Sequence, residues 1–554
     1  MSSGAGSVDA LVNTAQAWAD RDPDPESRRQ VERLVTAMRA GDDAARDELT
    51  DAFTGGLEFG TAGLRGALGP GPNRMNRVVV IRAAAALAAH LHDIGATGPV
   101  VVGHDARHNS EVFARDTAEI LTGAGFPVLQ FDRPVPTPLV PATILRRGAV
   151  AGVVVTASHN PPADNGYKVY LGDGCQIVPP ADTAIAAQLA RLADTDPAEL
   201  PRGTDVTLLG DETIAEYVAR VASVTPEGPR DIAWVHTALH GVGAPVVRAA
   251  AQSAGFPVPV EVAEQAEPDP DFPTVSFPNP EEPGAIDLAL AAANRHDVDV
   301  VIANDPDADR CAVAVRRDGA WQMLTGDEVG GLLGHDFMHR GVEGNYAASV
   351  VSASRLATLA EAYGQPYVTT LTGFKWIGRV PGLVFGYEEA IGYCCDPDAV
   401  RDKDGISAAL HVLAIAARAK SEGRTIAELL DDLDRSYGVC GTDQLSVRVT
   451  DRQLIDDAMA GLRARPPTLL LDEPVAVQDL SEASDDLPAT DAMLLRGRTA
   501  RVVVRPSGTE PKLKCYLEVT APPGADPADS RDRVRDGLAR LRSEMAGVLG
   551  VEGR

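Results

Sequence analysis

The sequence predicts a mixed α/β protein with about three or four domains. Short runs of β-branched residues alternate with Ala- and Leu-rich amphipathic stretches, a pattern typical of strands and helices packed in layers. The chain has 554 residues, and domains average roughly 150 residues. Hydrophobic residues make up 44% of the chain, which is enough to build substantial cores.

The individual elements follow from this alternation. Valine-rich runs predict strands at residues 100–102, 153–155 and 300–302. Amphipathic stretches predict helices at residues 78–91, 111–122 and 406–419, and a last helix at 530–548 that closes a C-terminal domain. Polar or proline-rich segments are expected to be loops or domain boundaries, near residues 194–203, 226–231, 264–283 and 473–486.

The charge balance limits the possible partners. The chain has 51 Lys and Arg against 79 Asp and Glu, a formal net charge of -28. Such an acidic surface repels nucleic acid and anionic membranes, so we expect neither as a partner. The charge also serves solubility. A phosphorylated substrate would need a local concentration of Arg, Lys, amide dipoles and metal.

Cysteine usage and hydropathy indicate the compartment. The six cysteines are scattered, no CxxC pair occurs, and adjacent Cys394 and Cys395 cannot bond without strain. We therefore expect neither a disulfide framework nor a zinc site. No basic segment followed by an apolar run opens the chain, and no stretch approaches the ~20 apolar residues of a membrane span. A cytoplasmic location is the resulting expectation.

A candidate nucleophile follows the predicted strand at 153–155, in the sequence TASHNPP at residues 156–162. A strand that ends in a polar turn would project the Ser158 hydroxyl from the end of a sheet, where ligands of α/β folds bind. His159 and Lys168 lie close in sequence and could deprotonate a hydroxyl or neutralise a phosphate. A turn in which Ser and Asn simply cap the strand is the alternative.

A second strand leads into three aspartates, in the sequence NDPDADR at residues 304–310. Extended spacing puts Asp305, Asp307 and Asp309 on one side of the chain. Converging carboxylates repel one another unless a cation lies among them, and hard oxygen ligands favour Mg²⁺. A calcium EF-hand loop is excluded, because its sixth position would be Arg310 instead of Gly and its twelfth Arg316 instead of Glu. Arg310 could hold a phosphoryl group, and a solvated acidic turn remains the alternative.

Two further loops carry groups suited to a sugar phosphate. Glu388 and Glu389 on a glycine-bounded loop could bind adjacent hydroxyls, act in acid–base chemistry, or form a surface turn. Thr372, Gly373 and Lys375 lie in a nearby loop that adds a cation. In the sequence RPSGTEP at residues 505–511, a strand ends in an arginine and small residues expose their amides, which suits a phosphate cradle or an ordinary β-turn.

These loops, in this order, resemble the α-D-phosphohexomutase superfamily, which includes phosphoglucomutases and phosphomannomutases. The chain is most similar to its phosphoglucomutase-2/phosphopentomutase-like branch. The resemblance spans most of the chain and rests also on GTAGLRG at residues 60–66, GHDARHNS at 103–110, HGVG at 240–243 and FPNPEE at 277–282.

The resemblance implies three similar mixed α/β domains and a C-terminal α+β domain around a central cleft. The expected boundaries are 1–212 with the phosphoserine loop, 213–324 with the metal loop, 325–440 with the sugar loop and 441–554 with the phosphate loop. The implied enzyme interconverts a sugar 1-phosphate and 6-phosphate through a phosphoserine and a bisphosphorylated sugar. It would use Mg²⁺ and a sugar bisphosphate activator, bind a small sugar phosphate, and be a monomer or homodimer.

The resemblance also implies residue roles. Ser158 would be the phosphoserine, Arg65 would assist it, and His159 and Lys168 would transfer protons. Mg²⁺ would be bound by the phosphorylated Ser158 and by Asp305, Asp307 and Asp309. The residues that would bind substrate are Arg310, Thr372, Gly373, Lys375, Glu388, Glu389, Arg505, Ser507, Gly508 and Thr509.

Two departures from the family pattern leave the sugar open. Pro306 fills a glycine position of the metal loop, which stiffens the loop while keeping the spacing of the ligands. The sugar loop has Ala390 in place of a serine, an inserted Ile391, and Tyr393 in place of a histidine. Glucose 1-phosphate is the first expectation, with mannose or ribose and deoxyribose phosphates as alternatives. A phosphatase and a catalytically silent sugar-phosphate binder are the rival functions.

Overall fold

A computed structural model of the chain describes residues 3–60, 63–448, 453–483, 487–507, 512–524 and 526–551. The chain divides into two compact units. Unit 1 comprises Met1–Thr225, Ala233–Cys311 and Asp398–Leu410, and unit 2 comprises Pro226–Ile232, Ala312–Pro397 and His411–Arg554.

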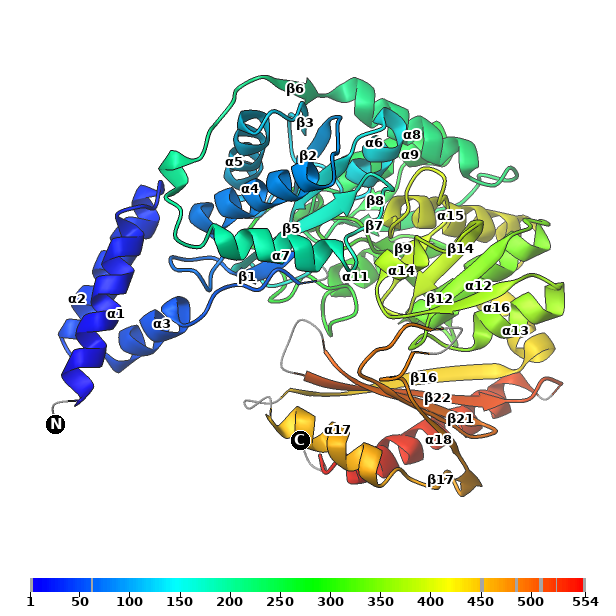
Figure 1. The fold of residues 1–554 in the computed structure, drawn as a ribbon. Helices are drawn as coiled ribbons and strands as arrows, with labels where there is room; N and C mark the ends of the chain where they lie inside the picture. The colour runs from blue at the N-terminus through cyan, green and yellow to red at the C-terminus, as the bar shows by residue number, and fades with distance from the viewer. Residues whose placement is uncertain are drawn as a thin grey trace. The chain divides into compact units, whose positions relative to one another are not determined.

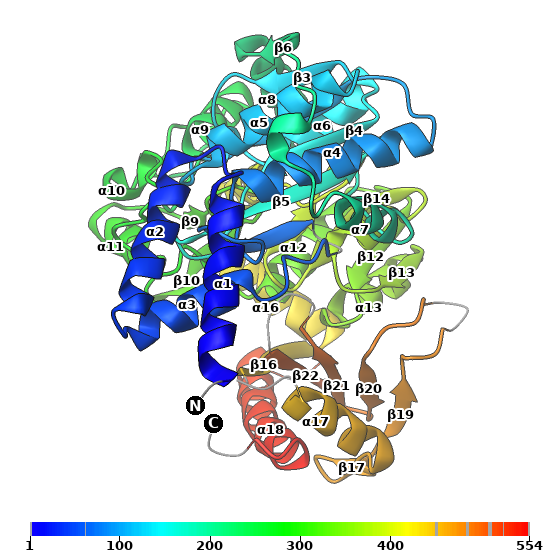
Figure 2. The same ribbon diagram turned by 60° about the vertical axis from the view of Figure 1, so that its left-hand side comes forward.

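Unit 1 begins with three helices that precede its first sheet, α1 (Ser3–Ala19), α2 (Pro25–Arg39) and α3 (Asp43–Phe53). They have a hydrophobic core of their own, in which Val12, Val35 and Leu49 are buried. Figure 2 shows them as a separate helical layer at the start of the chain. This helical layer was not predicted from the sequence.

A six-stranded sheet forms the centre of unit 1, in the order β1-β5-β4-β2-β3-β6 (Figure 1). Its strands are β1 (Leu64–Ala67), β2 (Val100–His104), β3 (Val128–Phe131), β4 (Ala151–Val155), β5 (Asp164–Leu171) and β6 (Val206–Leu209). Strands β4, β2, β3 and β6 are parallel, and β5 is antiparallel to β4 and β1. The helices of this region are α4 (Arg77–Asp93), α5 (Ser110–Gly123), α6 (Leu139–Arg147), α7 (Ala181–Arg191), η1 (Pro197–Glu199) and α8 (Asp211–Val224).

A second group of parallel strands follows in unit 1, with β7 (Trp234–Thr237) paired to both β8 (Val260–Glu261) and β9 (Val300–Ala303). Its helices are α9 (Ala244–Ser253), α10 (Ala263–Ala266) and α11 (Asp287–Arg295). Every residue of β2, β4, β7 and β9 is buried. Burial along the whole strand is typical of parallel strands covered on both faces.

Unit 2 contains a hairpin and a four-stranded sheet in the order β13-β12-β14-β15. The hairpin is β10 (Ala312–Arg317) with β11 (Ala320–Met323), and the sheet strands are β12 (Asn345–Ser349), β13 (Tyr367–Thr370), β14 (Leu383–Glu388) and β15 (Gly392–Cys394). Its helices are α12 (Gly326–His339), α13 (Arg355–Tyr363), α14 (Phe374–Ile377) and α16 (Ile426–Tyr437); α15 (Gly405–Ser421) spans the change of unit. Capping boxes at Thr325 and Thr425 fix where α12 and α16 begin.

The C-terminal part of unit 2 is an antiparallel sheet in the order β16-β22-β21-β20-β19, covered by α17 and α18 (Figure 1). Its strands are β16 (Val439–Arg448), β19 (Ala476–Asp479), β20 (Met493–Arg496), β21 (Ala500–Pro506) and β22 (Lys512–Ala521), beside the short pair β17 (Leu469–Leu470) and β18 (Glu473–Pro474). The helices are α17 (Gln453–Ala464) and α18 (Pro527–Val548), and Met459 and Leu541 join the core beneath the sheet.

The predicted mixed α/β class is confirmed. The predicted helices correspond to α4, α5, α15 and α18, and the predicted strands to β2, β4 and β9, with small differences at the ends. The expected loop at residues 473–486 is partly wrong, because β18 and β19 lie in it. β19 is an exposed edge strand, so its polar sequence does not prevent pairing with β20.

Among the helices of the described residues, none is both long enough and apolar enough to cross a membrane.

Candidate active site

The candidate site of unit 1 lies where buried strands end. Val155 of β4 is opposite His104 of β2 in a parallel pair, so the loops that follow the two strands leave the sheet at one edge. Ser158 follows β4 by three residues, and Asp305 follows the end of β9 by two. The carboxyl ends of parallel strands are the usual place for a ligand in an α/β protein.

Ser158 is held in a conformation that L-residues rarely adopt. Its φ is 52° and its side chain is buried. The backbone N–H of Ser158 donates to Thr156 Oγ1 at 2.8 Å. Its hydroxyl donates to Asp305 Oδ2 at 2.7 Å and lies 3.2 Å from His159 Nδ1. Left-handed strain of this kind persists only where the surroundings fix it, which is common at functional sites.

The three aspartates converge, as the sequence analysis expected of a metal site. One oxygen from each of Asp305, Asp307 and Asp309 lies within 4.8 Å of the others, and all three residues are at most 1% exposed. Oδ1 of Asp307 and Oδ1 of Asp309 are buried and accept no hydrogen bond from any described residue. Buried carboxylate oxygens without a donor are costly unless a cation binds them, so this donor set fits a divalent cation with a preference for oxygen ligands, such as Mg²⁺.

The protonation of the trio reflects the same imbalance of charge. Burial, with repulsion from Asp307 and Asp309, raises the pKa of Asp305 well above its ordinary value. Burial acts to raise the pKa of Asp307, as does repulsion from Asp309, but Lys168 and the hydrogen bond from Thr137 together lower it. Burial also acts to raise the pKa of Asp309, but Lys168, Lys403 and Arg310 together lower it. Lys168 Nζ donates to Asp307 Oδ2 at 2.7 Å and to Asp309 Oδ2 at 2.9 Å. Lys403 and Arg310 lie farther from the carboxylates, at 3.4–3.9 Å, and neither is close enough to hydrogen-bond the two unsatisfied oxygens.

Neighbouring loops fix the aspartate loop in place. Thr137 donates its hydroxyl to Asp307 Oδ2 at 2.6 Å and its N–H to the Asp307 carbonyl at 2.9 Å. The N–H of Val242 donates to the Pro306 carbonyl at 2.8 Å. Gly241 packs so closely that a Cβ there would lie 2.2 Å from Pro306 Cα and from Pro306 O. The aspartates are therefore preorganised by contacts that do not involve a ligand.

His159 and Arg65 lie at the rim of this site. Burial, with the nearby charges of Arg310 and Arg65, lowers the pKa of His159 well below its ordinary value, so the ring is neutral near pH 7. A neutral ring nitrogen beside the Ser158 hydroxyl can accept a proton. Arg65 donates to Asn160 Oδ1 at 3.3 Å, and Arg310 Nε lies 3.9 Å from Asp305 and 3.8 Å from Asp309.

Two residues of this site were not identified from the sequence. Arg107 donates to four backbone carbonyls of the serine loop, those of Ser158, Asn160, Pro161 and Asp164, at 2.5–3.2 Å. Its position three residues after β2 was the available signal. Lys403 lies 3.4 Å from Asp309 Oδ2, and nothing in its local sequence distinguishes it from a surface lysine.

Unit 2 brings the predicted sugar-loop residues together. Glu388 ends β14, and its Oε1 accepts the N–H of Gly373 at 2.7 Å; Gly373 lies beside Thr372 and directly before α14, which contains Lys375. Glu389 differs from its neighbour, because its Oε2 accepts the hydroxyls of Ser349 at 3.2 Å and Ser352 at 3.1 Å. The paired carboxylates expected on one loop are thus directed to different partners.

The predicted phosphate loop is described only in part. Arg505 lies near the end of β21, opposite Lys514 of β22, and the Ser507 N–H donates to the Lys512 carbonyl at 2.8 Å. Gly508 and Thr509, which the sequence analysis placed in the same cradle, lie outside the described residues.

Known protein families match most of the chain. Four domain families described as phosphoglucomutase/phosphomannomutase match in order: α/β/α domain I at residues 56–196, domain II at 215–319, domain III at 325–437 and the C-terminal domain at 447–536. The four matches bear out the expected four-domain architecture.

Individual relatives cover nearly the whole chain. A probable phosphomannomutase of Haemophilus influenzae is 46% identical over 466 residues, covering 83% of this chain and 95% of its own. A phosphopentomutase of Homo sapiens is 34% identical over 606 residues, covering 98% and 97%. The crystal structure of a phosphoglucomutase/phosphomannomutase family protein of Burkholderia thailandensis has the same fold, with a TM-score of 0.66 at 20% identity, covering 88% and 97%.

Gly241→Ala tests the packing of the aspartate loop. The added methyl group must displace Pro306, so we expect the affinity for Mg²⁺ to fall by about 10- to 100-fold. Isothermal titration with Mg²⁺ measures this. Gly461→Ala is the matched control, since a Cβ at Gly461 meets nothing within 4 Å. Equal affinities in the two variants would contradict the proposed preorganisation.

Arg107→Lys tests the support of the serine loop. A lysine has one donor atom and cannot reach four carbonyls, so amide hydrogen exchange at Ser158 and Asn160 should accelerate about tenfold or more. Mass spectrometry of the peptide containing these residues measures it. Arg115→Lys, an exposed change on α5, is the control and should leave the exchange unaltered. Unchanged exchange in the Arg107 variant would disprove the support.

Proposed function

The chain belongs to the phosphoglucomutase/phosphomannomutase family and is therefore an enzyme of the phosphomutase class, and we propose that Ser158 is the residue through which it moves a phosphoryl group within one sugar. The observation that carries this proposal is the contact of 2.7 Å between the Ser158 hydroxyl and Asp305, within a buried trio of aspartates. A plain strand cap would need neither the strained serine nor the carboxylates.

The proposed cycle has two phosphoryl transfers. In the first, the bond between phosphorus and Ser158 Oγ breaks while a new one forms to a hydroxyl oxygen of a sugar monophosphate. The hydroxyl loses its proton, Ser158 Oγ gains one, and a sugar bisphosphate results. In the second, the other phosphoryl group of the bisphosphate returns to Ser158 and the isomeric monophosphate leaves. A sugar bisphosphate would also phosphorylate the resting enzyme.

The chain's own residues supply positioning, charge and proton transfer. His159, neutral and 3.2 Å from Ser158 Oγ, would accept the serine proton and return it. Asp305, Asp307 and Asp309 would hold Mg²⁺, which when bound stabilises negative charge on the transferring oxygens. Lys168, Arg65 and Arg310 would balance the remaining charge. Positioning of the reacting groups contributes much of the rate in phosphoryl transfer.

We assign two further groups of residues, both in unit 2, to recognition of a sugar phosphate. Glu388, Gly373, Thr372 and Lys375 form the proposed sugar-binding set. Arg505 and Ser507, with Gly508 and Thr509, form the proposed site for the phosphate that is not transferred. Guanidinium and amide donors recognise phosphate without depending on the orientation of the sugar, which suits a cycle in which the bisphosphate must bind in two directions.

For the identity of the sugar, we rank pentose and mannose phosphates ahead of glucose 1-phosphate, which was the first expectation from the sequence. The two relatives described above are named a phosphopentomutase and a phosphomannomutase. Ile391 and Tyr393, which replace parts of the expected hexomutase loop, are fully buried, and Ile391 has a φ of 52°. These residues pack inward, so this loop offers fewer polar contacts to a hexose.

Ser158→Ala should abolish isomerisation, with a loss of roughly a thousandfold or more, because both phosphoryl transfers of the proposed cycle use the Ser158 oxygen. A coupled assay of sugar 1-phosphate conversion measures it, and circular dichroism should show an intact fold. Ser223→Ala, an exposed change on α8, should retain full activity. Appreciable turnover by the Ser158 variant would refute its role as carrier.

A panel of 1-phosphates of ribose, deoxyribose, mannose and glucose, each with its bisphosphate activator, tests the ranking of sugars. We expect kcat/KM for a pentose or mannose phosphate to exceed that for glucose 1-phosphate by about tenfold, the scale of a few lost hydroxyl contacts. A preference for glucose 1-phosphate would overturn the ranking. Release of inorganic phosphate faster than isomerisation would indicate a phosphatase instead.

A further inference from the structure

A short segment of unit 2, residues 349–354 between β12 and α13, receives hydrogen bonds from several elements, and we call it the bridging loop. The C-terminal sheet contacts it from one side and the sugar loop from another. None of its residues was among the predicted site residues. Its hydrogen bonds nevertheless connect the sugar loop, which contains Glu388, with β21, which contains Arg505.

Arg501 of β21 forms the connection to the C-terminal sheet. Its Nη1 donates to the Ser352 carbonyl at 3.0 Å, and its Nη2 donates to the Val350 carbonyl. Nη1 also lies 3.0 Å from Glu518 Oε2 on β22, in an ion pair whose side chains are 16% and 5% exposed. Glu518 Oε1 accepts the N–H of Ser354 at 3.0 Å. A single buried ion pair thus orders both halves of the bridging loop.

Ser352 forms the connection to the sugar loop. Its hydroxyl donates to Glu389 Oε2 at 3.1 Å, and the N–H of Glu389 is 3.2 Å from the same hydroxyl oxygen. Ser349 lies 2.9 Å from Ser352 and adds a second hydroxyl to Glu389. Glu389 is the neighbour of Glu388, which holds the N–H of Gly373. The carboxylate of Glu389 is therefore a structural anchor within this unit.

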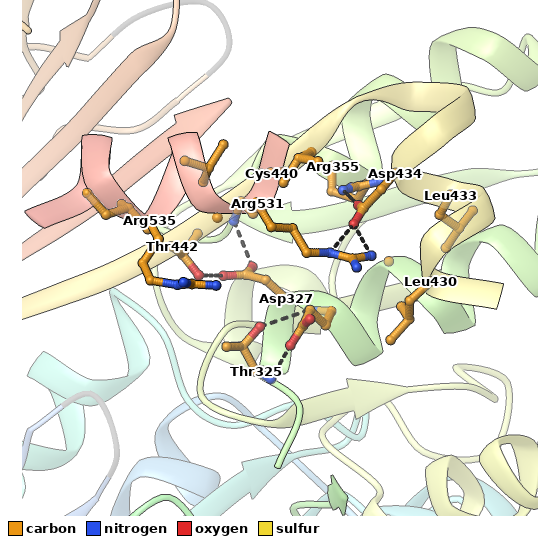
Figure 3. Close-up of a pocket in the computed structure, with 17 residues that line it drawn as sticks. Thr325, Asp327, Arg355, Leu430, Leu433, Asp434, Cys440, Thr442, Arg531 and Arg535 are labelled. Atoms are coloured by element: carbon orange, nitrogen blue, oxygen red, sulfur yellow. Dashed lines mark hydrogen bonds and ion pairs between the residues drawn. The ribbon is translucent and has the colours of Figure 1, made fainter. Parts of the chain in front are cut away.

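Asp327, at the start of α12, fixes the middle of the bridging loop. Its Oδ1 accepts the N–H of Ala353 at 2.7 Å and the hydroxyl of Tyr387 at 2.9 Å, and its Oδ2 accepts the hydroxyl of Thr442 at 3.1 Å. Figure 3 shows Asp327 and Thr442 joined beside a cavity of about 220 Å³. Tyr387 directly precedes Glu388, so this bond also leads to the sugar loop.

The same face of β21 carries Arg501, Val503 and Arg505, because side chains alternate along a strand. Val503 packs in one hydrophobic cluster with Val350 and Val351 of the bridging loop. Arg501 and Arg505 are four residues apart, roughly 13 Å along the strand. A path of hydrogen bonds and packing contacts therefore leads from the strand that contains Arg505 to the loop that contains Glu388.

We propose that Arg501 is a positioning residue that couples the proposed sugar-binding and phosphate-binding elements. Through Ser352 and Glu389 it fixes the sugar loop relative to β21, the strand that contains Arg505. This inference rests on the proposed function for its catalytic consequence. The consequence follows because a loop held in one geometry need not be ordered when the sugar binds. Loosening it should weaken substrate binding more than it slows the chemical step.

The test compares two single variants, their double variant and a control in the full-length chain. Arg501→Lys keeps a cation for Glu518 but cannot donate to two carbonyls as a fork, and Ser352→Ala removes the hydroxyl that meets Glu389. Arg496→Gln is the control, since Arg496 is opposite Arg501 in the β20–β21 pair, is exposed, and has no ion-pair partner among the described residues. The readouts are amide exchange at Glu389 and Gly373, and KM and kcat.

We expect both Arg501→Lys and Ser352→Ala to accelerate exchange at Glu389 and Gly373 and to raise KM by roughly 3- to 30-fold, with a smaller change in kcat. The rise in KM of the double variant should be smaller than the product of the rises in the two single variants, because both changes break the same path. If Arg501→Lys changes neither the amide exchange nor KM more than the control Arg496→Gln does, the inference is overturned. Inactivity of the unmodified enzyme on every sugar phosphate would defeat the proposed function alone, since the exchange measurement still decides whether Arg501 holds the sugar loop.

Discussion

The structure of unit 1 depends on how three buried carboxylates are neutralised. Asp305, Asp307 and Asp309 are confined within 4.8 Å, and one lysine ammonium contacts two of them. Lys403 and Arg310 also lie within 3.9 Å, yet burial and mutual repulsion still raise the pKa of Asp305. Two carboxylate oxygens accept no hydrogen bond among the described residues, which leaves a need for a cation in direct contact with them. A divalent cation meets that need, and the contact of Asp305 with Ser158 then places a hydroxyl beside it.

Candidate site residues could be located from the sequence where they directly follow a buried strand. Valine runs predicted β4 and β9, and their polar continuations contained Ser158 and the aspartates. It missed contacts made across distant segments. Arg107 supports the serine loop from the segment that follows β2, and Lys403 approaches Asp309 from a segment nearly a hundred residues away. Local patterns do not encode such pairings, because they depend on how the chain packs.

The paired glutamates show the same limit. Adjacent carboxylates suggested two equivalent contacts to a sugar, yet Glu389 accepts two serine hydroxyls inside unit 2 while Glu388 accepts the N–H of Gly373. A buried carboxylate must be hydrogen-bonded, and the serines that satisfy Glu389 lie some 40 residues earlier in the chain. The departures at Ile391 and Tyr393 are likewise buried, so these residues of the loop serve the fold of unit 2.

The central claim is that the oxygen of Ser158 and the aspartate trio share one metal-centred site. Phosphorus NMR of the enzyme phosphorylated on Ser158, titrated with Mn²⁺ in place of Mg²⁺, tests it most directly. We predict strong paramagnetic broadening of the phosphoserine resonance, lost in Asp307→Asn. A phosphoserine signal that stays sharp at saturating Mn²⁺ would contradict the account.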